Sequence, residues 1–227
     1  MSDEDEIKLN NKEKIDLTIQ TALQLIPSGI GAAISNIYFG IKQEKRFKRL
    51  ERFYSEIAQE LKSLQSGELI KINDKISLLN NYDKEAFVFI FEQLNDKIER
   101  EFASQKINIL KSYLKSTLRD PVNGNNFDKR KFFLDAIGSM TIFECEILGY
   151  IYNQKEFIKV ESIIKGGIDK YEILGSINRL KSFGFIITYQ FSYATADAVK
   201  GHETGFDENI EISPLGREFG EFCLTTQ

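Results

Sequence analysis

Few residues in this chain are of a type that could carry out catalysis or bind a metal. Its single histidine, His202, lies in the sequence Lys-Gly-His-Glu-Thr-Gly at 200–205, which is typical of a flexible loop. A histidine-based zinc site or a Ser-His-Asp triad would have to be built around that one residue. Cys145 and Cys223 lie far apart in apolar surroundings and outside any CxxC pair, so we expect buried thiols. We therefore expect a protein that is not an enzyme and that binds no cofactor and no metal.

The glycine-rich sequences do not change this interpretation. Gly166-Gly167 and Gly29-Ile30-Gly31 are not followed by the Gly-Lys-Ser/Thr sequence that a phosphate loop requires. They are more typical of helix ends. The acidic residues are spread along predicted helix faces, and no pattern brings two of them together for glycosidase-type chemistry.

A basic cluster near the N-terminus could bind an anionic surface. Between positions 42 and 52 there are six basic residues and two acidic ones. A solvated helix face is the ordinary interpretation. Anionic lipid and nucleic-acid phosphates are two further ones, because both attract clustered cations. The candidate anionic-surface contacts are Lys42, Lys45, Arg46, Lys48, Arg49 and Arg52.

Directly before this cluster, residues 17–41 form a run of 25 residues without a charge. As one helix this run would reach across a hydrocarbon layer of about 30 Å. Pro27, Gly29 and Gly31 interrupt it, and several polar residues lie within it. We therefore expect a buried soluble hairpin of two helices, 13–25 and 29–41. The alternative is contact with a membrane.

The next helix carries a heptad pattern. Apolar residues follow one another at spacings of 3, 4, 3, 4 and 3, which predicts a helix packed lengthwise against a partner helix. The period does not say whether that partner comes from the same chain. We expect the helix to end at Gly67. The residues of the seam are Phe47, Leu50, Tyr54, Ile57, Leu61 and Leu64.

A shorter element is predicted at 69–79, followed by one long helix that Asp83 caps and that runs to about Arg119. The sequence 120–126 contains Pro121 and an Asn-Gly pair, which favour a turn. We place the domain boundary there. The predicted organisation is a disordered acidic tail at 1–12, a helical region at 13–126 and a second module at 127–227.

In the second module, periodicity predicts helices at 128–139, after Thr141, at 159–164, and after Asp169. Gly184 ends the last of these. Two β-branched runs, 185–191 and 209–213, then predict a hairpin with a long polar tip. Pro214 opens a closing helix at 215–224. The whole chain is thus expected to be mainly α, with a small β-hairpin.

This order of elements resembles the winged-helix modules, and most of all those of MarR-like regulators. Residues 177–186, Ile-Asn-Arg-Leu-Lys-Ser-Phe-Gly-Phe-Ile, resemble a recognition helix leading into a wing. Residues 212–219, Ile-Ser-Pro-Leu-Gly-Arg-Glu-Phe, resemble a second wing strand leading into the last helix. The resemblance covers about the last 85 residues and is specific for topology more than for function. Residues 1–126 resemble no family that we recognise.

The resemblance implies that the helix after Asp169 enters the major groove and that the hairpin contacts the flanking backbone. With Ile173, Ile177 and Leu180 facing inward, steps of 100° turn the opposite side of the helix outward. Asn and Arg side chains suit base edges. The candidate nucleic-acid contacts are Tyr171, Asn178, Arg179, Ser182 and, in the hairpin tip, Lys200.

Charge argues against DNA, because eight Lys and Arg stand against 13 Asp and Glu from Thr141 onward. Phosphate neutralisation supplies much of the affinity for nucleic acid. The hairpin tip is also acidic, with Asp197, Glu203, Asp207 and Glu208 against Lys200. A winged helix used for protein contact, or only as structure, is therefore favoured over one that binds DNA.

The composition, 42% hydrophobic and 28% charged over 227 residues, is that of a folded protein. The acidic start Met-Ser-Asp-Glu-Asp-Glu is unlike a secretory signal, so we expect a cytoplasmic location. The leading hypothesis is a bacterial, non-enzymatic interaction protein that contacts a protein partner or itself, with DNA binding in transcription as its most concrete form. The alternative is a membrane-associated toxicity or phage-defence effector that uses residues 17–41 and the basic cluster.

Overall fold

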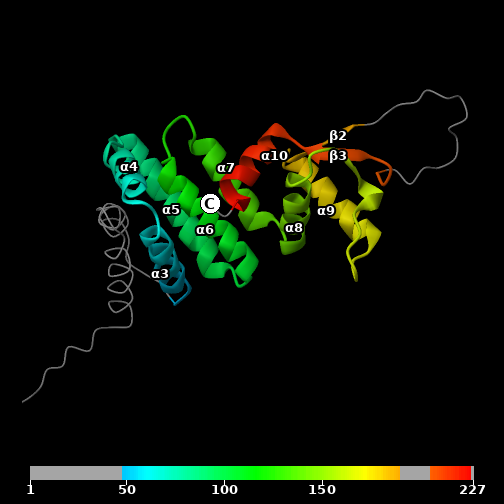
Figure 1. Cartoon of the computed structure of the whole chain (residues 1–227), viewed down its shortest axis with the longest axis horizontal. Helices are drawn as coiled ribbons and strands as arrows, with labels where there is room; N and C mark the ends of the chain where they lie inside the picture. The colour runs from blue at the N-terminus through cyan, green and yellow to red at the C-terminus, as the bar shows by residue number, and fades with distance from the viewer. Residues whose placement is uncertain (1–47, 190–204, 226–227) are drawn as a thin grey trace, which may run out of the picture. The chain divides into compact units, whose positions relative to one another are not determined.

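A computed structural model describes residues 48–189 and 205–225 of the chain. The chain divides into two compact units, Met1–Gly138 and Ser139–Gln227 (Figure 1). The division comes after the helix that follows the expected boundary at residue 126, so residues 127–138 belong to the first unit. The predicted acidic tail and the two predicted helices at 13–25 and 29–41 lie outside the described residues.

The described part of the first unit is entirely helical. Helix α3 packs against α5 and α6, and α4 packs against α6 (Figure 1). The helices are α3 (Lys48–Lys62), α4 (Ser66–Ser77), α5 (Asn81–Arg100), α6 (Ser104–Arg119) and α7 (Phe127–Ser139).

The heptad seam finds its partners within the same chain. Four of its residues, Leu50, Tyr54, Ile57 and Leu61, are buried where α3 meets α5 and α6. The Tyr54 hydroxyl donates a hydrogen bond to Oδ1 of Asn95 on α5, at 2.7 Å. The heptad seam of α3 therefore packs against helices of the first unit.

Ion pairs run along the same helices. Lys111 and Lys115 on α6 pair with Glu56 and Glu60 on α3. Lys111 pairs with Glu56, and Lys115, one turn further along α6, pairs with Glu60, one turn further along α3. The two helices therefore run parallel at this contact. Polar contacts and the apolar seam thus specify the same pairing.

Helix α3 ends earlier than predicted. It stops at Lys62, and the amides of Ser63 and Leu64 donate to the carbonyls three residues before them, each at 3.1 Å. These tight bonds close the last turn. Gly67, predicted to end α3, instead lies in the first turn of α4.

The prediction of a single long helix from Asp83 to Arg119 is wrong, because the helix is interrupted by a turn between α5 and α6. Oε1 of Glu101 accepts hydrogen bonds from the amides of Phe102 and Ala103, both at 2.9 Å. Phe102, expected on the apolar face, is 86% exposed at this turn. The cap of α5 also differs from the prediction, since it is Asn80 that accepts from the amide of Asp83.

The second unit combines helices with a small antiparallel sheet of order β1-β3-β2. In the hairpin, Ile186 pairs with Ile212 and Tyr189 with Asn209. Strand β3 is central, and β1 pairs with its other edge, away from β2. The elements are α8 (Ile142–Tyr152), β1 (Ile158–Lys159), the 3₁₀ helix η1 (Val160–Ser162), α9 (Lys170–Ser182), β2 (Ile186–Tyr189), β3 (Asn209–Ile212), α10 (Pro214–Phe219) and the helical turn η2 (Gly220–Leu224).

The prediction of a helix at 159–164 is wrong. The chain forms β1 and the single turn of η1 there. The amide of Val160 donates to the carbonyl of Glu208 at 3.0 Å, and that of Glu161 to the carbonyl of Phe206 at 2.9 Å. Because these two amides donate to carbonyls of the segment that leads into β3, they are not available for the hydrogen bonds of a longer helix.

The predicted helix ends of the second unit are confirmed. Thr141 caps α8 in a complete capping box with Glu144, and Asp169 caps α9. Gly184 ends α9 with a positive φ of 74°, which favours glycine. Pro214 opens α10 behind the Ser213 cap. These local signals place α9 and the hairpin correctly in the chain.

The fold class is therefore mainly helical with a small antiparallel sheet. Among residues 48–189 and 205–225, no helix is both long and apolar enough to cross a membrane.

Candidate functional site

The outward face of α9 is the first candidate surface. Tyr171, Asn178, Arg179 and Ser182 are all exposed, whereas Ile173, Ile177 and Leu180 on the opposite side are buried. This orientation agrees with the helical period. Lys200, the fifth predicted contact, lies outside the described residues.

Arg179 is engaged within its own unit. Its Nη1 lies 3.2 Å from Oε1 of Glu144, and its Nη2 donates to the carbonyl of Ser139 at 3.0 Å. The Glu144 side chain is 3% exposed. A nearly buried carboxylate thus holds the guanidinium of a residue that is a candidate nucleic-acid contact.

Four further side chains of α9 also contact groups of the second unit. Lys181 forms an ion pair with Glu208, and the Ser182 hydroxyl donates to the carbonyl of Arg179 at 2.7 Å. The Tyr171 ring meets the Phe206 ring edge-on, with centroids 5.3 Å apart. The ammonium of Lys170 lies 5.0 Å from each of these two ring centroids. Positive charge on α9 is therefore largely matched by groups of the same unit.

The structure describes only part of the basic cluster. Lys42, Lys45 and Arg46 lie outside the described residues, as does the side chain of Lys48. Nη1 of Arg49 donates to the carbonyls of Glu99 and Glu101 at 3.1 and 2.7 Å, at the C-terminal end of α5. There a positive charge complements the helix dipole.

Arg52 is the other member of the cluster whose side chain is described. It pairs with Glu56 at 2.8 Å, one turn along the same helix. The hydrogen bond that Arg52 donates to the Glu56 carboxylate raises the pKa of the guanidinium. Both described arginines of the cluster thus have partners in the chain, and the predicted membrane contact stays a prediction.

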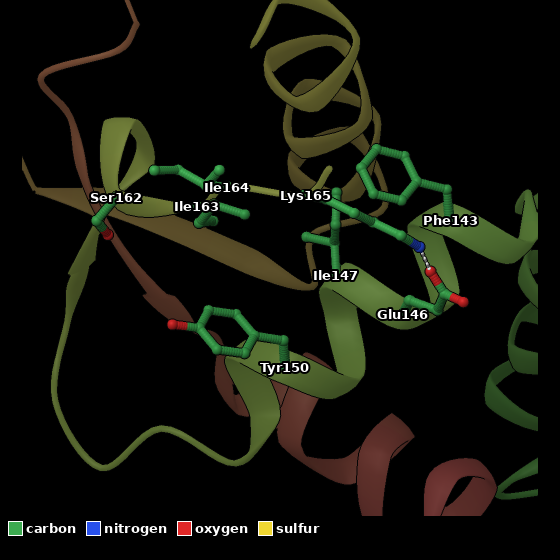
Figure 2. A pocket seen from close by; sticks show the side chains of 8 residues that line it. All are labelled: Phe143, Glu146, Ile147, Tyr150, Ser162, Ile163, Ile164 and Lys165. Atoms are coloured by element: carbon green, nitrogen blue, oxygen red, sulfur yellow. Dashed lines mark hydrogen bonds and ion pairs between the residues drawn. The ribbon is translucent and has the colours of Figure 1, made fainter. Parts of the chain in front are cut away.

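A hollow between α8 and the loop after η1 is a second candidate surface, which sequence analysis missed. Its volume is about 300 Å³, at the lower end of the range for small-molecule pockets (Figure 2). Its lining residues are Phe143, Glu146, Ile147, Tyr150, Ser162, Ile163, Ile164 and Lys165.

The walls of the hollow are apolar. Phe143, Ile147 and Tyr150 come from one face of α8, at spacings of four and three. Ile163 and Ile164 come from the loop that crosses over them (Figure 2). Ile147 is buried at the base, whereas Ile164 is 87% exposed at the rim. The hollow therefore opens to solvent beside a projecting isoleucine.

An ion pair borders one side of the hollow. The ammonium of Lys165 pairs with the Glu146 carboxylate and lies 5.0 Å from the centroid of the Phe143 ring (Figure 2). Both charged side chains are about half exposed, at 46% and 45%. Tyr150 and Ser162 lie on the side away from this pair (Figure 2). The rim thus presents one positive and one negative charge next to apolar surface.

The hollow left little trace in the sequence. Nearly all of α8 is apolar, so its period does not mark which side stays open. Ile163 and Ile164 lie where a helix was predicted. The signal in the sequence for this surface was the pair Ile163-Ile164, which lies between polar residues just before Gly166-Gly167.

The expectations about cysteine and metal concern other parts of the chain. Cys145 and Cys223 are both buried, as predicted. In the part of the chain that the structure describes, His, Cys, Asp and Glu side chains form no group of three or more suited to a metal ion.

Comparison with protein families, curated proteins and solved structures finds no match for this chain.

Proposed function

We propose that this chain is a non-enzymatic interaction protein whose second unit is a winged-helix-like module that binds protein. The order of α8, η1, α9, the β2–β3 hairpin and α10 supports this proposal. It follows the winged-helix order, with one 3₁₀ turn in place of the second helix. In this proposal the protein works in the cytoplasm, where both buried thiols remain reduced.

One observation carries the choice of protein over DNA. The second unit has an open apolar hollow with Ile164 and Tyr150 exposed at its rim. Exposed apolar and aromatic side chains around a recess are typical of protein interfaces. On α9, by contrast, a phosphate would have to compete with Glu144 for Arg179. The geometry therefore favours the hollow as the contact surface.

Site-specific photocrosslinking tests this proposal. A photoreactive phenylalanine analogue is placed at Ile164 or Tyr150 of the full chain, and at the exposed Glu172 on α9 as a control. In cells of the source organism, we expect protein adducts from the two rim positions and not from position 172. The rim adducts should disappear with Glu146→Lys, which changes the rim charge. Adducts from position 172 alone, or none at all, would overturn the proposal.

DNA binding is the second candidate function, and the exposed polar side chains of Asn178 and Ser182 favour it. Gel retardation of duplex DNA at low salt tests it. Asn178→Ala is a cleaner probe than Arg179→Ala, because removal of Arg179 also leaves Glu144 without its cation. Retardation that Asn178→Ala weakens would establish DNA binding by this face of α9. No retardation at low salt would exclude it.

A further inference from the structure

We infer that the hollow takes a second copy of this chain, with Ile164 of each copy inserted beside α8 of the other. This inference rests on the proposed function, in which the rim is a protein contact. It names the partner as a two-fold related copy of the same unit.

The shape of the rim fits a two-fold interface. Such an interface pairs a patch with itself, so the patch must carry both a projection and a recess. Ile164 projects from the loop with 87% of its surface exposed. The recess beside it is about 300 Å³ and is walled by Phe143, Ile147 and Ile163. One patch therefore holds both halves of a self-complementary contact.

The charges of the rim fit the same arrangement. Lys165 and Glu146 are neighbours with nearly equal exposure. In a two-fold complex, Lys165 of one copy can pair with Glu146 of the partner subunit, and the reverse pair forms by symmetry. The second unit carries more acidic than basic residues, so two copies have net charges of the same sign and repel each other. At this rim one positive and one negative charge cancel, so the rim adds nothing to that repulsion.

Analytical ultracentrifugation of the full chain at micromolar concentrations tests the inference. The wild type should be in monomer–dimer equilibrium. Glu146→Lys makes the rim wholly positive and Lys165→Glu makes it wholly negative. The dimer dissociation constant of each variant alone should therefore rise at least about tenfold, because like charges then face each other. A mixture of the two variants should form dimers again, since their rims are complementary.

Matched controls separate the rim from the rest of the surface. Lys131→Glu on α7 changes a lysine that is 44% exposed, close to the value for Lys165, and it should leave the dimer intact. Glu172→Lys on α9 reverses an exposed carboxylate outside the rim and should do the same. Ile164→Asp removes the projection without touching the core and should give a folded monomer by circular dichroism.

Three results would overturn the inference. They are a monomeric wild type, a dimer that both charge variants leave unchanged, and charge variants whose mixture stays monomeric. The photocrosslinking experiment separates this failure from failure of the proposed function. Rim adducts with a different protein, together with a monomeric wild type, would retain the protein contact and reject the second copy. An absence of adducts would reject both.

Discussion

Arg179 and Glu144 join the last turn of α9 to the first turn of α8, with Nη1 of the arginine 3.2 Å from Oε1 of the glutamate. The other carboxylate oxygen, Oε2, accepts a hydrogen bond from the amide of Thr141 at 2.7 Å. Glu144 therefore serves the capping box and the ion pair at once. An arginine on the exposed side of α9 holds two helices of the second unit together.

Arg179→Ala is expected to lower the free energy of unfolding by about 1–3 kcal/mol, because it leaves a buried carboxylate without its cation. Urea denaturation followed by circular dichroism measures the change. Arg217→Ala on α10 removes an exposed arginine and should change stability by less than about 0.5 kcal/mol. Equal effects of the two variants would show that the pair with Glu144 contributes nothing.

Two glycines of the second unit should respond to alanine in opposite directions. A Cβ at Gly216 would lie 2.1 Å from the carbonyl oxygen of Phe185, so the backbone would have to move. We expect Gly216→Ala to lower stability by about 1–3 kcal/mol or more, as overpacking does.

Gly175, in the middle of α9, has open space where a Cβ would be placed. Gly175→Ala should raise stability by about 0.5–1 kcal/mol, since alanine loses less backbone entropy in a helix. Thermal unfolding of both variants measures the two effects. A stabilised Gly216→Ala variant would contradict the close packing of α10 against Phe185.

The turn between α5 and α6 should make the first unit sensitive to acid. Burial raises the pKa of the Glu101 carboxyl, but hydrogen bonds from the Ala103 amide, from Lys106 and from the Phe102 amide outweigh it, so the pKa is lowered. At Asp135, burial acts in the same way, and the ammonium groups of Lys131 and Lys97 lower the pKa below its usual value.

A lowered pKa in the folded state means that the unfolded state binds more protons as pH falls. The stability from these carboxylates is therefore fully present above their unfolded pKa of about 4 and is lost as pH falls through the folded value. Glu101→Gln should lower stability at pH 7, and the difference from wild type should shrink near pH 3. Urea denaturation at both pH values measures this. A difference that is constant with pH would contradict an ionised role for Glu101.

The seam of α3 should contribute to the core of the first unit. Ile57 is almost completely buried, and Ile57→Ala should cost about 2–5 kcal/mol because it leaves a cavity. Leu78 is 84% exposed, and Leu78→Ala should change stability by less than about 0.5 kcal/mol. Chemical denaturation of both variants provides the comparison. A mild effect at Ile57 would mean that α3 packs loosely.

Local signals predicted much of the second unit. Thr141 and Asp169 cap their helices, and Gly184 ends α9, because each of these effects depends on a few neighbouring residues. The same reasoning failed between Glu101 and Ala103. The helical period continues across that point without Gly or Pro, and the break is stabilised by Arg49, which is far away in sequence.

Periodicity also identified the apolar face of α3 and the outward face of α9, since helical geometry alone sets which residues share a side. Three features depended on the tertiary structure: α5 and α6 as the partners of α3, Glu144 as the partner of Arg179, and the hollow between α8 and the loop of Ile164. Each brings together segments that are distant in sequence. A local pattern specifies that a face is apolar or charged, but the group that meets it is decided by how the chain packs.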